Sequence, residues 1–324
     1  MKTAVIVALA ALTAATTFAQ STPTKAPGTP AAASFVSPRT PWGDPDLQGT
    51  WPGGPVFSVP FERAPELGTR ATLTNEEAAK RNAGIVAQAA GVDGVANFWP
   101  ELGLAPPLTS LIVEPENGRL PPLTEDGARR AKEWRVRADP SYPAPSAADL
   151  RPYDRCITRG VLGSAFPNQY GSGMQIHQSP GFVVIRYEMV HEARVIPLDR
   201  RPHVSPAMQT YMGDPRGSWD GDTLVVETTN FNGRTGSYAR NGDGNPTTTA
   251  LRLVERFRLR DTGTLLYEVL VDDPQTFVRP WRVAFPLSRD ESYLLHEYAC
   301  HEGNYALANI LRAARAAEGT ANIK

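Results

Sequence analysis

One short stretch of the sequence, YEMVHEAR at residues 187–194, places a histidine between two glutamates. Glu188 and His191 would flank the turn of a predicted hairpin. A histidine held near a carboxylate can act as a general acid or base, or as a metal ligand. The stretch predicts His191 as an acid–base residue assisted by Glu188. A surface hairpin carrying only Glu–Arg ion pairs is the alternative that the residues leave open.

A second stretch, HEYACHEGNY at residues 296–305, contains two His-Glu pairs. His301 and Glu302 follow a predicted strand and precede a predicted helix, a position where active residues are often held. We predict His301 as a second acid–base residue, with Glu302 assisting it and Asn304 contacting the substrate. The alternative is a strand-to-helix junction in which Asn304 caps the helix and Gly303 supplies a special backbone angle.

The histidines also raise the question of a metal. His191, His203 and His301 could converge as the ligands of a three-histidine site, although the sequence has no H-E-x-x-H motif and the spacing does not require convergence. No cofactor is predicted, and a transition metal stays open.

Arginines and aromatic residues suggest what the substrate looks like. Arginine binds carboxylates with two parallel hydrogen bonds, so Arg159 and Arg194 are predicted to hold a carboxylate or oxyanion. Trp219 and Tyr298 are predicted to stack against a sugar or aromatic ring, the alternative being ordinary core packing. Further arginines that could bind a carboxylate are Arg155, Arg252 and Arg256.

The two cysteines, Cys156 and Cys300, are most simply explained as one disulfide of an exported protein, with two free or metal-binding thiols as the alternative. A disulfide holds its Cα atoms about 5–6 Å apart. It would therefore bring residues 154–159 next to residues 298–304, which carry the second His-Glu stretch.

The elements that must position these residues differ between the two halves of the chain. Helices are predicted from a capping box at Thr74–Glu77 through about residue 90, from Thr124 through about 137, and over 305–317. Beyond residue 150, short apolar runs between turn residues predict strands at 181–188, 192–197, 216–219, 223–230, 251–260, 265–272, 279–287 and 293–300.

Composition and the start of the chain limit the protein class. The 324 residues carry a net charge of -1, which argues against a nucleic-acid binder, and the 30 prolines disfavour long helices. Residues 1–19 have the charged start, apolar run and small-residue cleavage site of a secretory signal peptide. Residues 20–39 are predicted as a disordered Pro/Ala/Thr linker, 40–150 as an irregular and partly helical wrap, and 151–324 as a β-barrel-like domain with a C-terminal helix.

Several motifs resemble those of a large family of exported bacterial proteins of unassigned function. They are TPWGDPDLQGTW at 40–51, YDRCITRG at 153–160, YEMVHEAR at 187–194, GSWDGDTLVVETTNF at 217–231 and YACHEGNY at 298–305. The resemblance spans residues 40 to 317 and implies export and a single unit, but it transfers no catalytic residues. The Gly-x-Trp opening before a meander also resembles lipocalin-type barrels.

Together these patterns predict a mainly β protein, an antiparallel barrel or barrel-like sandwich. The predicted function is that of a periplasmic or secreted lyase or hydrolase acting on a carbohydrate or aromatic glycoside-like substrate by His/Glu acid–base chemistry. The alternative is a non-catalytic periplasmic barrel that binds a small ligand. No nucleic-acid partner and no membrane-spanning segment in the mature chain are expected, and the oligomeric state is left open.

Overall fold

The computed structural model describes residues 35–90, 103–138, 144–168, 170–236 and 244–321. The chain divides into a unit Met1–Val36 and a unit Ser37–Lys324, and the elements described here belong to the second unit. The predicted signal peptide lies outside the described residues, as does most of the predicted linker. At the end of that linker, Ser37 is buried and Arg39 forms an ion pair with Asp222.

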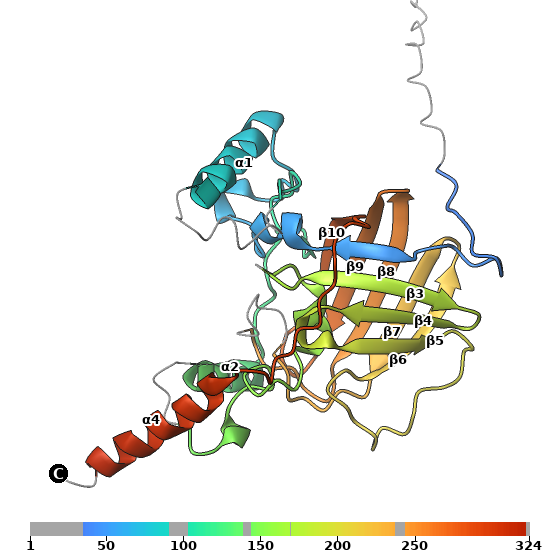
Figure 1. Cartoon of the computed structure of the whole chain (residues 1–324). Helices are drawn as coiled ribbons and strands as arrows, with labels where there is room; N and C mark the ends of the chain where they lie inside the picture. Colours follow the sequence, from blue (N-terminus) through green and yellow to red (C-terminus); the bar gives the residue numbers. More distant parts are fainter. Residues whose placement is uncertain (1–34, 91–102, 139–143, 169, 237–243, 322–324) are drawn as a thin grey trace, which may run out of the picture. The chain divides into compact units, whose positions relative to one another are not determined.

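The described strands form two antiparallel sheets (Figure 1). The smaller sheet has the order β1 (Gly49–Pro52), β3 (Gly173–Ser179), β4 (Phe182–Tyr187) and β5 (Ala193–Pro197). The larger has the order β2 (Ile112–Glu114), β10 (Trp281–Ser288), β9 (Thr264–Asp272), β8 (Arg252–Asp261), β7 (Thr223–Thr229) and β6 (Asp214–Asp220).

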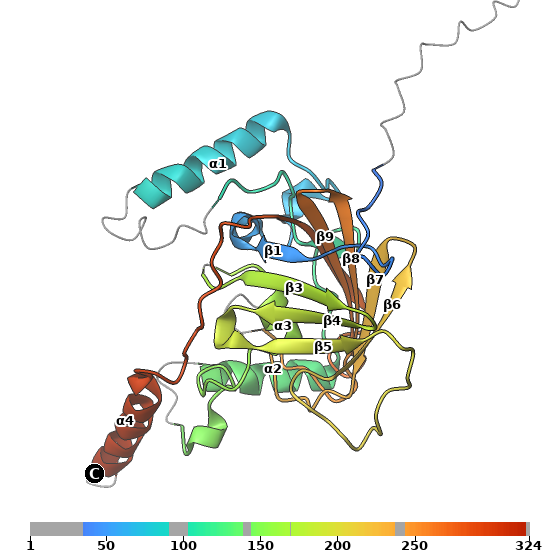
Figure 2. The same cartoon turned by 45° about the vertical axis from the view of Figure 1, so that its right-hand side comes forward.

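The two sheets pack face to face, and their strands run in different directions (Figures 1 and 2). One hydrophobic core lies between them, with contributions from Ile185 of the smaller sheet and Val269 of the larger. β1 contacts β10 and β5 contacts β6, so the sheets also meet along their sides. The mainly β prediction is confirmed. No closed barrel is formed by the described strands, and the arrangement is compatible with the sandwich form of the prediction.

Alternating burial explains why the longest strands form. In β9 every second side chain is buried, which is the period expected of a strand with one face on a core. Tyr267 of β9 pairs with Phe257 of β8 and Phe285 of β10, with ring centroids 5.0 and 5.2 Å apart. These cross-strand aromatic contacts fix the register of the three strands.

The predicted strand at 293–300 is wrong. Its backbone makes isolated contacts instead of a ladder, for example from Cys300 N–H to Tyr298 O, and Tyr293 anchors it by donating its hydroxyl hydrogen to Glu188. Strands β1, β2 and β3 were not expected from the sequence. β1 and β2 are short edge strands from the half predicted as a wrap, and they take their conformation from pairing with β3 and β10.

The longer helices match their predictions closely. They are α1 (Asn75–Ala90), α2 (Glu125–Ala138) and α4 (Tyr305–Ala321); a short α3 (Gly160–Ala165) was not predicted. Single 3-10 turns occupy Gly54–Ser58, Pro65–Leu67, Ala147–Asp149 and Met189–His191. The capping box of α1 is formed, with 2.8 Å from Thr74 N to Glu77 Oε2 and 3.2 Å from Glu77 N to Thr74 Oγ1.

Helix α2 lies against the loop that follows β9. Thr124 donates from N–H to Thr276 O and from its hydroxyl to Gln275 O. A Cβ atom on Gly127 would overlap the carbonyl of Thr276, so glycine allows the close approach. None of the helices in the described part of the chain is long and apolar enough to span a membrane.

Candidate functional site

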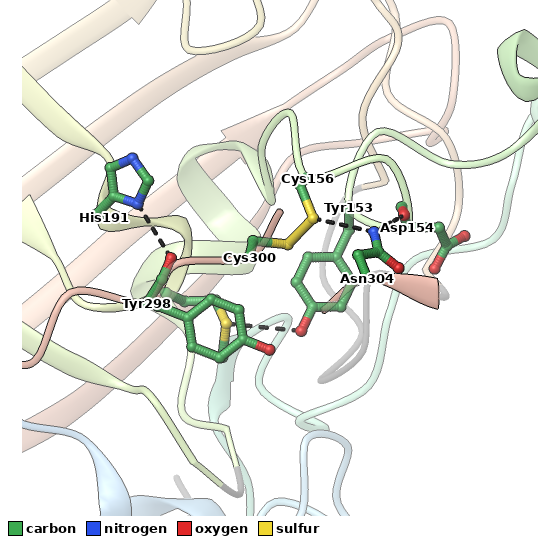
Figure 3. Close-up of a disulfide and its surroundings, with 8 residues drawn as sticks. Tyr153, Asp154, Cys156, His191, Tyr298, Cys300 and Asn304 are labelled. Atoms are coloured by element: carbon green, nitrogen blue, oxygen red, sulfur yellow. Dashed lines mark hydrogen bonds between the residues drawn. A yellow bond between two sulfur atoms is a disulfide. The ribbon is translucent and has the colours of Figure 1, made fainter. Parts of the chain in front are cut away.

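The two cysteines form the predicted disulfide, which links the turn before α3 to the segment before α4 (Figure 3). The Cα atoms of Cys156 and Cys300 are 5.5 Å apart, across 144 positions of sequence. Asn304 lies beside the bond, with its Nδ2 donating to Asp154 O and Cys156 Sγ, both at 3.3 Å. The expectation that residues 154–159 meet residues 298–304 is therefore confirmed.

His191 reaches the same place from the end of β4 (Figure 3). Its Nδ1 lies 3.0 Å from the backbone oxygen of Tyr298. A carbonyl oxygen only accepts hydrogen bonds, so Nδ1 must carry the proton, and the neutral ring keeps its lone pair on Nε2. The side chain is exposed. The contact thus selects the tautomer that a general base needs.

The backbone at this histidine is held in an uncommon conformation. Val190 and His191 have φ values of 61° and 45°, and Cys156 has a φ of 54°. Non-glycine residues rarely adopt the left-handed region, and a β-branched valine least of all. Such strain persists where the surrounding structure enforces it, which happens most often at functional sites.

Three tyrosines gather around Arg159 next to the disulfide. The charge of Arg159 acts on Tyr153, Tyr170 and Tyr298, and its guanidinium carbon lies 4.8 Å from the ring centroid of Tyr153. Arg159 is only 7% exposed, and its Nη2 donates to Asn168 Oδ1 at 2.9 Å. Burial lowers the pKa of this guanidinium, and the neighbouring phenols act in the opposite direction.

The environment of Tyr153 favours the protonated form of its phenol. Burial raises the pKa of its phenol above the usual 10.0, and the charge of Arg159 offsets part of that rise. One contact of its hydroxyl is with Met189 Sδ at 3.6 Å, a weak acceptor. In Figure 3 the hydroxyl ends of Tyr153 and Tyr298 face one another. Tyr153 is therefore protonated at neutral pH, and the charge of Arg159 is the influence that favours release of this proton.

Glu192 is a further titratable group of this cluster. Burial raises the pKa of its carboxyl, while a 2.6 Å hydrogen bond from Thr158 Oγ1 and the charges of Arg194 and His191 oppose the rise. The sequence placed Glu192 beside His191 but favoured Glu188 as the assisting carboxylate. Tyr153, Tyr170 and Asn168 were missed because they lie in segments without a regular period, and only their closeness to Cys156 along the chain could have indicated them.

Glu188 lies near His191 in sequence, but its carboxylate has another partner. Tyr293 donates its hydroxyl hydrogen to Glu188 Oε2 at 2.5 Å, and Glu188 is 9% exposed. His301 and Glu302 lie in the exposed turn after Cys300, where neither side chain has a hydrogen bond or ion pair within the described ranges. The structure therefore brings His191, Arg159, Tyr298 and Asn304 to the disulfide and leaves Glu188, His301 and Glu302 at its margin.

Arg194 and Trp219 lie in the sandwich. Arg194 pairs with Glu255 at 2.7 and 3.0 Å, and both side chains are almost inaccessible, at 1% and 0% exposure. Arg194 also donates to Tyr187 Oη and Thr228 Oγ1. Trp219, in β6, packs against the hydrophobic core.

The histidines do not meet as metal ligands in the part of the chain that is described. No group of three or more His, Cys, Asp or Glu side chains there has the geometry to hold a metal ion. His203 is paired with Asp214 through Nδ1 and Oδ2 at 2.9 Å.

Comparison with known proteins adds no relative: no protein-family model, curated protein or solved structure matches the chain. The resemblance to exported bacterial proteins rests on the sequence motifs and stays a prediction. Functional arguments for this protein therefore depend on the disulfide cluster itself, which we define as His191, Glu192, Arg159, Asn168 and the three tyrosines 153, 170 and 298.

Proposed function

We propose that the protein is an exported lyase that acts on an acidic carbohydrate by proton transfer at the disulfide cluster. The observation that carries the proposal is the convergence of three phenols on one buried guanidinium, beside an imidazole that contacts the backbone oxygen of one of these tyrosines, Tyr298. Export to the periplasm or outside the cell is supported by the formed disulfide, since such bonds persist in oxidising compartments.

The residue types favour elimination over hydrolysis. Most glycoside hydrolases use two carboxyl groups that face each other across the scissile bond. Among the described residues, the cluster has one carboxyl, that of the half-buried Glu192, beside phenols and an imidazole. Phenol and imidazole suit the removal of a proton from carbon and the return of a proton to oxygen.

The proposed step removes the hydrogen next to the substrate carboxylate. His191 Nε2 takes that proton, the electron pair of the C–H bond forms a C=C bond, and the bond from the β-carbon to the leaving oxygen breaks. Tyr153 gives its phenolic proton to the leaving oxygen. The positive charge of Arg159, whose Nη2 donates to Asn168 Oδ1, opposes the negative charge that builds up during the step. The product is an α,β-unsaturated carboxylate, which absorbs ultraviolet light.

The test is turnover of uronate-containing polysaccharides, followed by the ultraviolet absorbance of the new double bond. We expect His191→Gln to lower kcat by about 100-fold or more, since it removes the base. His177→Gln is the matched control, because His177 is an exposed histidine on β3. Tyr153→Phe should lower kcat similarly with little change in the melting temperature.

Two results would contradict the proposal. In the first, His191→Gln and Tyr153→Phe both retain wild-type activity. In the second, wild-type protein binds a ligand saturably but forms no product after long incubation, which would favour the non-catalytic binding protein.

A further inference from the structure

A cleft of about 700 Å³ is lined in part by Arg151, Pro152 and Arg155, the neighbours of Tyr153 in sequence. It is bounded by α2, by residues 148–152 and 155, and by the loops at 232–234 and 246–249. This volume falls in the range of small-molecule sites, about 300–1,000 Å³. Nothing in the proposed chemistry uses this cleft.

Arginine dominates the charged lining of the cleft. Five arginines line it, at 130, 137, 151, 155 and 234, against three acidic residues, at 126, 133 and 149. Each acidic side chain already has a partner. Asp126 pairs with Arg129 and Arg130, Glu133 pairs with Arg129, and Asp149 accepts hydrogen bonds from the backbone and hydroxyl of Ser146.

Three of these arginines have no such compensation. Arg137, Arg155 and Arg234 form no side-chain ion pair or hydrogen bond with any residue that the structure describes. Arg155 is half-buried, and the other two are exposed. By contrast Arg252 and Arg256, also considered as carboxylate binders, are paired with Glu227 and Asp220. Three guanidinium groups without a side-chain partner among the described residues therefore line one concave place, whereas others, such as Arg258, Arg279 and Arg312, lie outside it.

The other lining groups suggest sugar rings between the negative charges of a ligand. Trp134 and Tyr211 are half-buried and offer ring faces for stacking. Asn232, Thr249 and Gln275 offer amide and hydroxyl groups suited to sugar hydroxyls. Guanidinium groups match the planar carboxylate of a uronic acid with two parallel hydrogen bonds.

We infer that this cleft is a binding site for a short stretch of an anionic polysaccharide whose sugar rings carry carboxylates. Arg151 and Arg155 line the cleft, whereas Tyr153, between them in sequence, belongs to the disulfide cluster. A chain bound in the cleft would lie next to that cluster. The inference goes beyond the proposed function, because binding here does not require that the cluster be catalytic.

The test is calorimetric titration of the full chain with tetragalacturonate and with a neutral tetrasaccharide of the same length. We expect tetragalacturonate alone to bind. The triple variant Arg137→Gln, Arg155→Gln, Arg234→Gln should bind it at least about tenfold more weakly, because charge-assisted hydrogen bonds are lost. The matched control, Arg258→Gln, Arg279→Gln, Arg312→Gln, removes the same charge from positions outside the cleft and should stay within twofold of wild type.

Several outcomes would overturn the inference. They are equal weakening in both triple variants, equal binding of the neutral sugar, and binding only of a sulfated oligosaccharide or of single-stranded DNA. Arg137→Gln alone, at an exposed position, keeps the test valid if the triple variant unfolds, and it should also weaken binding. Binding retained by His191→Gln without turnover would support the cleft separately from the lyase proposal. Turnover by wild type, together with tetragalacturonate binding that is unaffected in the cleft variants, would contradict the cleft alone.

Discussion

Arg194 and Arg159 carry the same side chain in different chemical surroundings. Arg194 faces the carboxylate of Glu255 in the core, and hydroxyl groups of Tyr187, Thr228 and Tyr267 extend the network. Arg159 instead donates to the side-chain amide oxygen of Asn168 and lies near the three phenols of the disulfide cluster. Arg194 Nε is buried without a hydrogen-bond partner among the described residues. A buried ion pair that joins β5 to β8 is nevertheless expected to act on folding, so we infer that Arg194 holds the two sheets together.

This role predicts a large effect of breaking the pair. Arg194→Met leaves the Glu255 carboxylate buried without its cation, which should lower the free energy of unfolding by about 3–5 kcal/mol. The double variant Arg194→Met, Glu255→Gln removes both charges and should lose clearly less. Urea unfolding followed by fluorescence measures both. A single variant within about 1 kcal/mol of wild type, or a double variant as unstable as the single, would contradict the prediction.

At the scale of elements, predictions succeeded where the signal was local. The start of α1 is encoded by Thr74 and Glu77, three residues apart, and the structure forms that capping box. β3 escaped prediction because polar residues interrupt it and its partner β1 comes from far earlier in the chain. The segment 293–300 has a strand-like pattern, but it pairs with no other described strand. Individual side-chain contacts hold it instead, such as the hydrogen bond from Tyr293 to Glu188.

In the candidate site, too, the features with a local sequence signal were the ones that could be predicted. The disulfide could be predicted, and with it the meeting of Arg159 with Tyr298 and of Asp154 with Asn304. The contact between His191 and Tyr298 O could not, because it depends on a strained turn and on a backbone oxygen, neither of which has a side-chain signature. Arg155 was considered as a carboxylate binder, but its place with Arg137 and Arg234 in one cleft could not be predicted, for a related reason. Their lack of partners is a property of three-dimensional placement.

Asp214 is the carboxylate that holds the connection between β5 and β6, where Asn230 and Arg216 also donate to backbone oxygens. Burial raises its pKa, but hydrogen bonds from Val204 N–H, His203 and Arg216 outweigh this, and the pKa lies below the usual 3.8. The native state therefore binds that proton less readily than the unfolded chain. The stability that Asp214 contributes is present above the unfolded pKa and is lost as the pH falls through the lowered native pKa.

Asp214→Asn should therefore lower stability at neutral pH and should make the decline in acid shallower. Denaturant midpoints measured from about pH 7 down to about pH 2 give the comparison. Asp220→Asn, at the exposed end of the same strand, is the matched control and should leave the acid profile close to that of wild type. Parallel wild-type and Asp214→Asn profiles would show that this carboxyl does not contribute.

At the scale of the whole molecule, the disulfide closes a ring that contains β3 to β10. The segment between β10 and α4 lies outside the sheets and reaches the body through individual contacts. Among them are Tyr293 to Glu188, Tyr298 O to His191, and Asn304 to Asp154. Because the disulfide is the covalent member of this set, it should control both the global stability and the local order of the segment.

The variant Cys156→Ser, Cys300→Ser should lose about 4–5 kcal/mol of unfolding free energy on the chain-entropy model. Hydrogen exchange should rise first in residues 293–304, which lose their covalent attachment. Reductant should have the same effect on wild type and no effect on the double variant. Unchanged exchange in that segment, with stability within about 1 kcal/mol of wild type, would mean that the non-covalent contacts suffice.

The pairing of β1 and β2 has a consequence for how the chain could be divided. These two strands precede the ring, yet β1 completes the smaller sheet beside β3, and β2 completes the larger beside β10. A fragment that begins after residue 150 would therefore leave one edge of β3 and one edge of β10 without a partner strand. Such unpaired edges promote self-association. If the chain is cut between β2 and β3, the two fragments should stay associated. Backbone hydrogen bonds from β1 to β3 and from β2 to β10 would hold the first fragment on the second.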